Sequence, residues 1–257
     1  METVRFNAAN RPLPLDVANA MIRKYSPDAR PISDSELGMF QRSLVHRSYA
    51  SANATRVNAF APEGCMLIAE CSNERNEYLG DSVLALVVTS YLHERFPTQG
   101  EGFMTVMRTK IVNGIALADF ARHLGLQRWL VVSKEVEEGK GRDAKDVLED
   151  AFEAWLAAMY LTLGYDATRV WLVRFMETHV DFADTIVRQR DWKSALHTWF
   201  TATYRRAPEF RVIEQSPQFR VGVADATGST VATGCGGTQK AAENDAARAA
   251  LKYFGRL

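Results

Sequence analysis

The chain has 257 residues, 47% of them hydrophobic and 24% charged, and its 31 Lys and Arg are balanced by 31 Asp and Glu. That length fits one large domain or two ordinary ones, and the composition is sufficient for a buried core. There is no run of 18 uninterrupted apolar residues, and the start lacks the layout of a signal peptide. We therefore expect an intracellular, cytoplasmic protein with no membrane partner.

The first third of the chain predicts short helices and a loop. Residues 1–32 contain several prolines and polar side chains, which predicts a loosely attached N-terminal lead-in with a helix around 17–25. Ser33 and Glu36 have the spacing of a capping box, so a helix is expected from there to about residue 47. Residues 51–72 are small and polar with one apolar patch, which is typical of a loop or insertion.

Longer helices are predicted further along. The stretch from residue 73 to Pro97 is nearly all apolar after its first turns, and its length favours a buried helix over a strand. Apolar residues at helical spacing predict a helix over 103–124. A largely buried helix over 144–164 and an amphipathic helix over 167–188 follow.

The pattern changes near residues 188–191, where we place a domain boundary. A helix over 193–206 is followed by three short runs of alternating, β-branched character and by an Ala-rich helix over 238–254. This α-β-β-β-α order predicts a small α+β domain at 191–257 after a helical domain at 33–188. From residue 191 onward the charge is mildly basic, with nine Lys and Arg against six Asp and Glu, a weak sign of a module that binds polyanions.

Carboxylates occur at one-turn spacing on two of the predicted helices. Glu77 and Asp81 share one helix face, with Glu74 on the same side, and Asp150 and Glu153 share a face of another helix. Such acid pairs usually face solvent. Here each pair stands on a helix that is otherwise apolar, and buried carboxylates require a compensating charge.

An all-oxygen site of this kind suits Mg²⁺, with Mn²⁺ as a substitute. Divalent cations in such sites support phosphoryl chemistry, often as two ions about 3.5–4 Å apart. The acid pairs therefore predict a metal-dependent enzyme that acts on phosphate esters.

Four ordered motifs give this chain a specific resemblance. "NERNEYLGDSVLALVV" resembles the ribonuclease III signature, "VLEDAFEAWLAAMYL" resembles the second motif of that family, and "LVHRSYA" and "EGFMTVMRTKIVNG" resemble the segments before and between them. The C-terminal α-β-β-β-α unit is similar to a double-stranded-RNA-binding domain. The resemblance spans residues 33–257, and the long lead-in resembles forms from large DNA viruses.

The resemblance implies an all-α endonuclease domain that works as a homodimer on double-stranded RNA. It implies products with 5′-phosphate and 3′-hydroxyl ends and short 3′ overhangs. The catalytic and metal-binding residues that it implies are Glu77, Asp81, Asp150 and Glu153, with Glu74 and Glu101 as accessory acids. This chain departs from the family pattern at Asn76, where Leu is usual, and at Glu149, where a small residue is usual.

The resemblance also implies three RNA-contacting regions in the C-terminal domain. Their candidate residues are His197 and Thr201 in the first helix, Pro217 and Gln218 in the first strand loop, and Thr238, Gln239 and Lys240 at the last helix. The family prefers a row of bases at the last of these regions, where this chain keeps a single lysine. We therefore expect weak RNA binding by this module alone.

Two other functions are compatible with parts of the pattern. A non-cleaving double-stranded-RNA binder, such as a structural component or a silencing suppressor, would have the same fold. A site that has lost its catalytic activity usually lacks one of the acids, whereas this chain keeps all of them. A helical phosphohydrolase of small nucleotides would leave the C-terminal module without a purpose. His46 is interpreted as a hydrogen-bonded structural residue.

Overall fold

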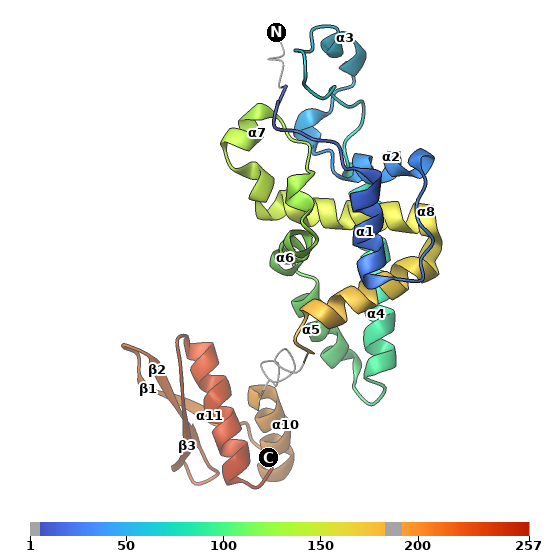
Figure 1. Ribbon diagram of the computed structural model, residues 1–257. Helices are drawn as coiled ribbons and strands as arrows, with labels where there is room; N and C mark the ends of the chain where they lie inside the picture. The colour runs from blue at the N-terminus through green and yellow to red at the C-terminus, as the bar shows by residue number, and fades with distance from the viewer. Residues whose placement is uncertain (1–5, 183–191, 257) are drawn as a thin grey trace. The chain divides into compact units, whose positions relative to one another are not determined.

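The computed structural model describes residues 6–182 and 192–256 (Figure 1). The chain divides into two compact units, Met1–Thr185 and Ile186–Leu257, and each is described by itself. The domain boundary predicted at 188–191 lies outside the described residues. Within the described part, no helix has both the length and the apolar character that a membrane crossing requires.

The first unit is built from helices around one long central helix, α8, against which α1, α2, α4 and α6 pack (Figure 1). The helices are α1 (Leu15–Tyr25), α2 (Asp34–Ser43), α3 (Ala54–Asn58), α4 (Glu74–Arg95), α5 (Glu101–Ile111), α6 (Gly114–Leu124), α7 (Lys134–Glu138) and α8 (Lys145–His179). The 3₁₀ turns η1 (Arg47–Tyr49), η2 (Leu126–Arg128) and η3 (Gly141–Asp143) lie between them. The helical character predicted for this part of the chain is confirmed.

Local chemistry divides two of the long helical stretches. The predicted helix at 103–124 is two helices, because the Asn113 side chain accepts hydrogen bonds from the backbone N–H groups of Ile115 and Ala116, each at 3.1 Å, and so begins α6. Gly164 has a φ of 81°, which interrupts the helical path inside α8 where the sequence predicted a helix end. Beyond it, α8 ends at His179, and residues 183–188 of the helix predicted over 167–188 lie outside the described residues.

The N-terminal segment is part of the core, so the expectation of a loose lead-in is wrong. Leu13, Ile22 and Tyr25 are buried. The side-chain amides of Asn7 and Asn10 donate to the Val132 carbonyl at 3.1 and 3.0 Å. These bonds tie the start of the chain to a segment more than 120 residues away, which no local sequence pattern reveals.

Residues 51–72 are mostly irregular, as predicted, but they are folded onto the unit. The Tyr49 hydroxyl donates to the Met66 carbonyl at 2.7 Å, and Asn58 exchanges hydrogen bonds with the backbone of Ile68 at 2.8 and 2.9 Å. A small apolar cluster around the buried Tyr49 and Ile68 supports the segment. Its polar composition therefore conceals a local core.

The crossing of α4 and α8 is the most extensive helix contact of the first unit. It is also very close, because a Cβ added at Gly80 would lie 1.7 Å from the backbone oxygen of Glu153. Large side chains of α8 fill the space beyond the crossing, and the buried Trp155 packs edge-on against Phe40 with ring centroids 4.9 Å apart. A glycine is thus required where the two backbones meet.

The second unit has the predicted α-β-β-β-α order. Its elements are α10 (Trp192–Tyr204), β1 (Glu209–Glu214), β2 (Phe219–Ala224), β3 (Thr230–Gly236) and α11 (Gln239–Tyr253). The strands form an antiparallel sheet in the order β1-β2-β3, and α11 packs on β2 and β3 beside α10. Leu196, Phe200 and Val221 lie in a core that the alanines of α11 close.

Substituting Gly80 with Ala should destabilise the first unit strongly. The added methyl group meets backbone atoms of α8 that cannot move without separating the helices, so we expect a loss of about 3 kcal/mol or more in the free energy of unfolding. Gly38→Ala is the matched control, because nothing lies within 4 Å of a Cβ at that helical position. Helix propensity alone predicts a gain of up to about 1 kcal/mol there. Urea denaturation measures both, and equal stabilities would contradict the close crossing.

Candidate active site

The crossing of α4 and α8 brings the predicted acid pairs together. Gly80, which meets Glu153 at the closest point, lies between Glu77 and Asp81 in the sequence. On the facing helix, Asp150 stands one turn before Glu153. Two carboxylates of each helix therefore flank a single point of contact.

Glu153 is the most buried member of the group, with only 8% of its surface exposed. Burial, followed by the charges of Asp81, Glu149, Glu77 and Asp150, raises its pKa to about 8. Burial and neighbouring acids both oppose ionisation. The folded chain thus holds a carboxyl group that resists becoming charged unless a cation joins it.

The charges of the two helices act on one another directly. Burial, followed by the charges of Glu77 and Glu149, raises the pKa of Asp150 to about 6. The pKa of Glu77 is raised by burial and by the charges of Glu74 and Asp81. These carboxyl groups are therefore near neighbours across the helix contact.

The remaining acids of this region are more open. Asp81 is exposed, and so is Glu74, which accepts a hydrogen bond of 2.7 Å from the Ser72 hydroxyl. Glu149 is partly exposed and faces Lys145 at 3.3 Å. The extra charge of Glu149, noted as a departure from the family pattern, contributes to the electrostatics of the site.

Glu101 is not brought to the other acids within this chain. It begins α5, just after the C-terminal end of α4, and accepts a hydrogen bond from the Thr105 hydroxyl at 2.8 Å. Asp81 lies 14 residues before the end of α4 at Arg95. At 1.5 Å per residue, that is about 21 Å along the helix. A role for Glu101 at this site would require a second copy of the chain.

The carboxylate oxygens of these acids are suitable ligands for a hard divalent cation, although the side chains are not already arranged around a single metal position. Among residues 6–182 and 192–256, no three His, Cys, Asp or Glu side chains are arranged as a finished metal site. Carboxylate oxygens are the ligands that Mg²⁺ and Mn²⁺ prefer. A bound cation would relieve the repulsion that raises the pKa values of Glu77, Asp150 and Glu153.

A base near these acids, Arg47, was not among the residues predicted for the site. Its charge acts on both Glu77 and Asp150, where it favours the ionised forms. Arg47 belongs to the motif "LVHRSYA", which indicated the family resemblance but did not indicate a role for this arginine. In the same segment, His46 Nδ1 lies 2.9 Å from the Ser48 hydroxyl and accepts from the Ser48 backbone N–H at 3.2 Å, so its predicted structural role is confirmed.

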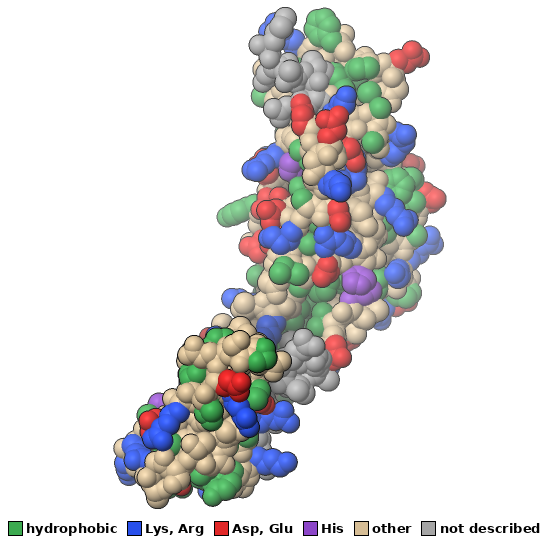
Figure 2. Space-filling model, turned by 90° about the vertical axis from the view of Figure 1, so that its left-hand side faces the viewer, with side chains coloured by type: hydrophobic (Ala, Val, Ile, Leu, Met, Phe, Trp, Pro, Cys, Tyr) green, Lys and Arg blue, Asp and Glu red, His purple; other side chains and the backbone are tan. Residues whose placement is uncertain are grey.

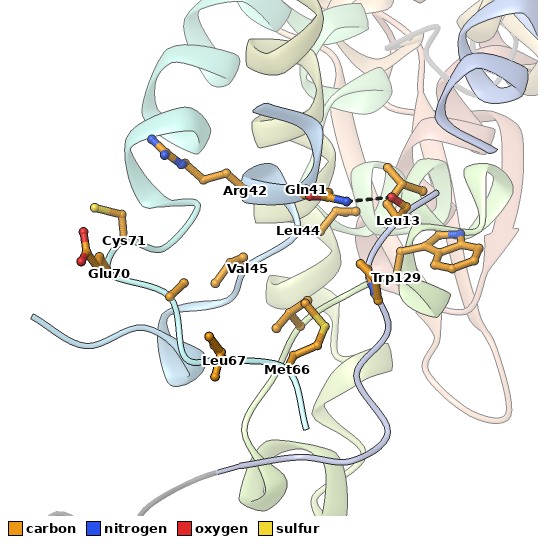
Figure 3. Close-up of a pocket in the computed structure, with 13 residues that line it drawn as sticks. Leu13, Gln41, Arg42, Leu44, Val45, Met66, Leu67, Glu70, Cys71 and Trp129 are labelled. Carbon is orange, nitrogen blue, oxygen red and sulfur yellow. Dashed lines mark hydrogen bonds between the residues drawn. The ribbon is translucent and has the colours of Figure 1, made fainter. Parts of the chain in front are cut away.

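A separate pocket of about 360 Å³ lies on the first unit (Figure 3). Leu44, Val45 and Met66 form its apolar wall, and Arg42, Glu70 and Cys71 also line it. None of the four predicted catalytic acids lines this pocket. The acidic group therefore lies outside this pocket.

The predicted RNA-contacting residues are all exposed and stand on three elements of the second unit. They are His197 and Thr201 on α10, Pro217 and Gln218 between β1 and β2, and Thr238, Gln239 and Lys240 at the start of α11. Thr238 caps α11 by accepting from the Ala241 backbone N–H at 3.2 Å. Lys and Arg side chains are scattered over the visible face of this unit and do not gather in one patch (Figure 2).

Two protein-family models match the two units. The ribonuclease-III-like model matches residues 36–179, which is more than half of the chain. The double-stranded RNA binding motif matches residues 192–254. The helical unit and the α-β-β-β-α unit thus correspond to one model each.

Two curated proteins match this chain over most of their own length. Ribonuclease 3 of Thermobifida fusca is 36% identical over 215 residues, which cover 82% of this chain and 83% of that protein. Ribonuclease 3 of Streptococcus pyogenes serotype M28 is 32% identical over 231 residues, or 88% of this chain and 94% of that protein.

A solved structure supports the fold of the first unit. The nuclease domain of ribonuclease III from Campylobacter jejuni matches with a TM-score of 0.52 and 25% identity, covering 64% of this chain and 97% of that one. Together, the helical fold, the paired acids and the matches over most of the chain lead to one conclusion. The chain belongs to the ribonuclease III family of metal-dependent endonucleases that act on double-stranded RNA.

Proposed function

We propose that Glu77, Asp81, Asp150 and Glu153 are the catalytic residues of this endonuclease and hold its metal, Mg²⁺, with Mn²⁺ as a substitute. The observation that carries this proposal is the crossing at Gly80, which gathers four carboxylates of two helices and makes them oppose one another's ionisation. No ion pair with a described base neutralises any of the four. Their carboxyl groups are therefore available to a cation.

The four side chains have different parts in this proposal. When bound, the divalent cation supplies an activated water and offsets the charge that builds on the phosphate oxygens. Glu153 is held by its burial and fixes the deep side of the site. Asp81 is exposed and lies on the side open to RNA, with Glu74 as an accessory acid. The proposed products carry 5′-phosphate and 3′-hydroxyl ends with short 3′ overhangs.

The active form that we propose is a homodimer through the endonuclease unit. Tyr78 and Leu86 lie about two turns apart on α4 and are 81% and 55% exposed. Large apolar side chains exposed on one helix favour burial against a partner. The Campylobacter jejuni nuclease domain is described as having a region involved in dimer formation. A second copy is also what Glu101 would need in order to reach a group of four acids.

The second unit is proposed to bind the RNA duplex through exposed residues of α10, the start of α11 and the loop between β1 and β2. Such modules read duplex shape over about 16 base pairs. Lys240 is exposed, whereas the neighbouring Gln239 is engaged with Glu243 at 2.9 Å. With few bases there, we propose that the module alone binds weakly.

Cleavage tests the site directly. The purified chain should cut a labelled RNA duplex of about 30 base pairs in Mg²⁺, since that length exceeds the roughly 16 that one module spans. Glu153→Gln should lower the single-turnover rate by about 100-fold or more, because a ligand of the metal is lost. Glu138→Gln is the matched control, because Glu138 is exposed on α7. If the wild type leaves the duplex intact but still shifts it on a gel, the non-cleaving binder becomes the correct function.

The metal-free chain should lose stability as the pH rises. The pKa of Glu153 in the folded chain, about 8, lies above its ordinary 4.5, so the folded state binds this proton more tightly than the unfolded state does. The stabilisation from this proton is complete when the pH is below the pKa of Glu153 in the unfolded chain. It is lost as the pH rises through the pKa of Glu153 in the folded chain. Glu153→Gln should remove it and be more stable by about 1–2 kcal/mol at pH 8 in EDTA.

Thermal unfolding of wild type, Glu153→Gln and Glu138→Gln in EDTA from pH 5 to pH 8 measures this slope. Addition of Mg²⁺ should restore the wild type more than Glu153→Gln, since ligand binding stabilises the folded state. A wild-type stability that does not change over this range would contradict the proposed repulsion.

The dimer is tested by a charge placed on its proposed surface. Leu86→Lys adds an ammonium group at a position that is already exposed, so the single chain should fold normally while the dimer weakens by at least about tenfold. Sedimentation equilibrium measures the mass, and Val212→Lys, at another exposed apolar position in the second unit, is the control. A Leu86→Lys chain as dimeric as the wild type would place the interface elsewhere.

A further inference from the structure

We infer that Arg47 is a phosphate-binding residue of the active site and that its guanidinium group holds the phosphate at which the RNA strand is cut. This inference rests on the proposed function, since it requires the four carboxylates to be the catalytic site. It assigns a role to the "LVHRSYA" segment, which the metal-binding residues do not account for.

Backbone hydrogen bonds fix the position of Arg47 beside the first turn of α4. The Asn73 N–H, immediately before that helix, donates to the Val45 carbonyl at 2.8 Å. The His46 N–H donates to the Val131 carbonyl at 3.0 Å, and the His46 ring caps the turn η1, which Arg47 begins. The segment is therefore held on both sides. Arg47 stands where the chain contacts the start of the helix that carries Glu77 and Asp81.

The side chain of Arg47 lies near several acids but forms no ion pair with them. Its segment lies beside Asn73, whose carbonyl accepts from the Glu77 N–H at 2.9 Å, and the Arg47 charge acts to lower the pKa of Glu77 and of Asp150. Yet Arg47 is exposed and forms no ion pair or hydrogen bond through its side chain with the described residues. Its five N–H donors are free for a ligand.

Some arginines of this unit form ion pairs, whereas Arg128, like Arg47, forms none with the described residues. Arg95 pairs with Glu177 at 3.1 Å, Arg122 pairs with Asp143 at 2.9 Å, and Arg142 pairs with Glu137. An arginine that served only to neutralise carboxylates would be expected to form such a pair, because charge-assisted hydrogen bonds are the strong ones. Arg47 stays open in the most acidic part of the unit.

The chemistry of the site gives this open arginine a function. A group of carboxylates repels the RNA phosphate that must approach it, and Arg47 supplies a permanent positive charge at the edge of that group. The planar guanidinium fork matches two oxygens of a phosphate. Because negative charge on those oxygens grows during hydrolysis, the contact becomes stronger in the transition state than in the bound duplex.

The test compares Arg47→Ala, Arg47→Lys and Arg128→Ala in the full chain. Arg128 is an exposed arginine of η2, so its removal makes the same change of charge on the same unit. With a labelled RNA duplex in Mg²⁺, we expect Arg47→Ala to lower the saturating single-turnover rate by about 10- to 100-fold, as loss of a transition-state donor does. The half-saturating enzyme concentration should change by less than about threefold, and Arg128→Ala should leave both values within about twofold.

Arg47→Lys should recover part of the lost rate, because it keeps the charge but not the fork. Binding of Mn²⁺ without RNA, measured by titration calorimetry, provides a readout that is independent of activity. Arg47→Ala should bind Mn²⁺ at least as tightly as the wild type, since a positive charge has been removed beside the cation. Weaker Mn²⁺ binding would show that Arg47 only organises the acids, and this would overturn the inference.

The remaining outcomes separate the two proposals. If the wild type cleaves and Arg47→Ala cleaves at the same rate, the phosphate-binding role of Arg47 is rejected while the proposed active site stands. An equal loss in Arg128→Ala would also reject it, because the effect would then be one of overall charge. A wild-type chain that does not cleave would reject the proposed function, and the role of Arg47 with it.

Discussion

The close contact between Gly80 of α4 and the backbone of Glu153 of α8 is the constraint on which the rest of the first unit depends. A side chain at residue 80 would separate the helices, and the acids on their facing turns would then move apart. With glycine there, the two backbones touch, and one-turn spacing on each helix places two carboxylates on either side. The electrostatics of the site therefore follow from a packing requirement.

The arrangement of acids that is proposed to bind the cation also lowers the stability of the metal-free chain. Buried, mutually repelling carboxylates disfavour the folded state, as the raised pKa of Glu153 shows. The same helix supplies the compensation, because Phe152, Trp155 and Leu156, next to the acids in the sequence, are fully buried. A large apolar core along α8 thus supports a charge group that would otherwise separate the helices, and cation binding is coupled to the remaining strain.

The sequence alone was enough to propose this site, because its signals are local and repeated. One-turn spacing identifies a shared helix face, and the motifs identify the family. It could not show that Gly80 is the point of contact, nor that Glu101 lies far from the other acids, because both depend on how helices cross. The tie of Asn7 and Asn10 to Val132 was also hidden, since hydrogen bonds between distant segments leave no periodic pattern. Asn is a residue type that favours helix caps, but the apolar spacing continues on both sides of Asn113. The sequence therefore predicted one helix where Asn113 begins a second one.

The distribution of charge over the chain favours recognition by several weak contacts. The second unit has only a mildly basic surface, and the first unit presents acids at the proposed cleavage site. Neither unit alone offers the row of bases that binds a duplex tightly. Because both units belong to one chain, contact by one raises the effective concentration of the other at the same duplex, and a dimer would double this effect. Affinity can then remain modest at each contact, while the cation and Arg47 supply positive charge only at the strand to be cut.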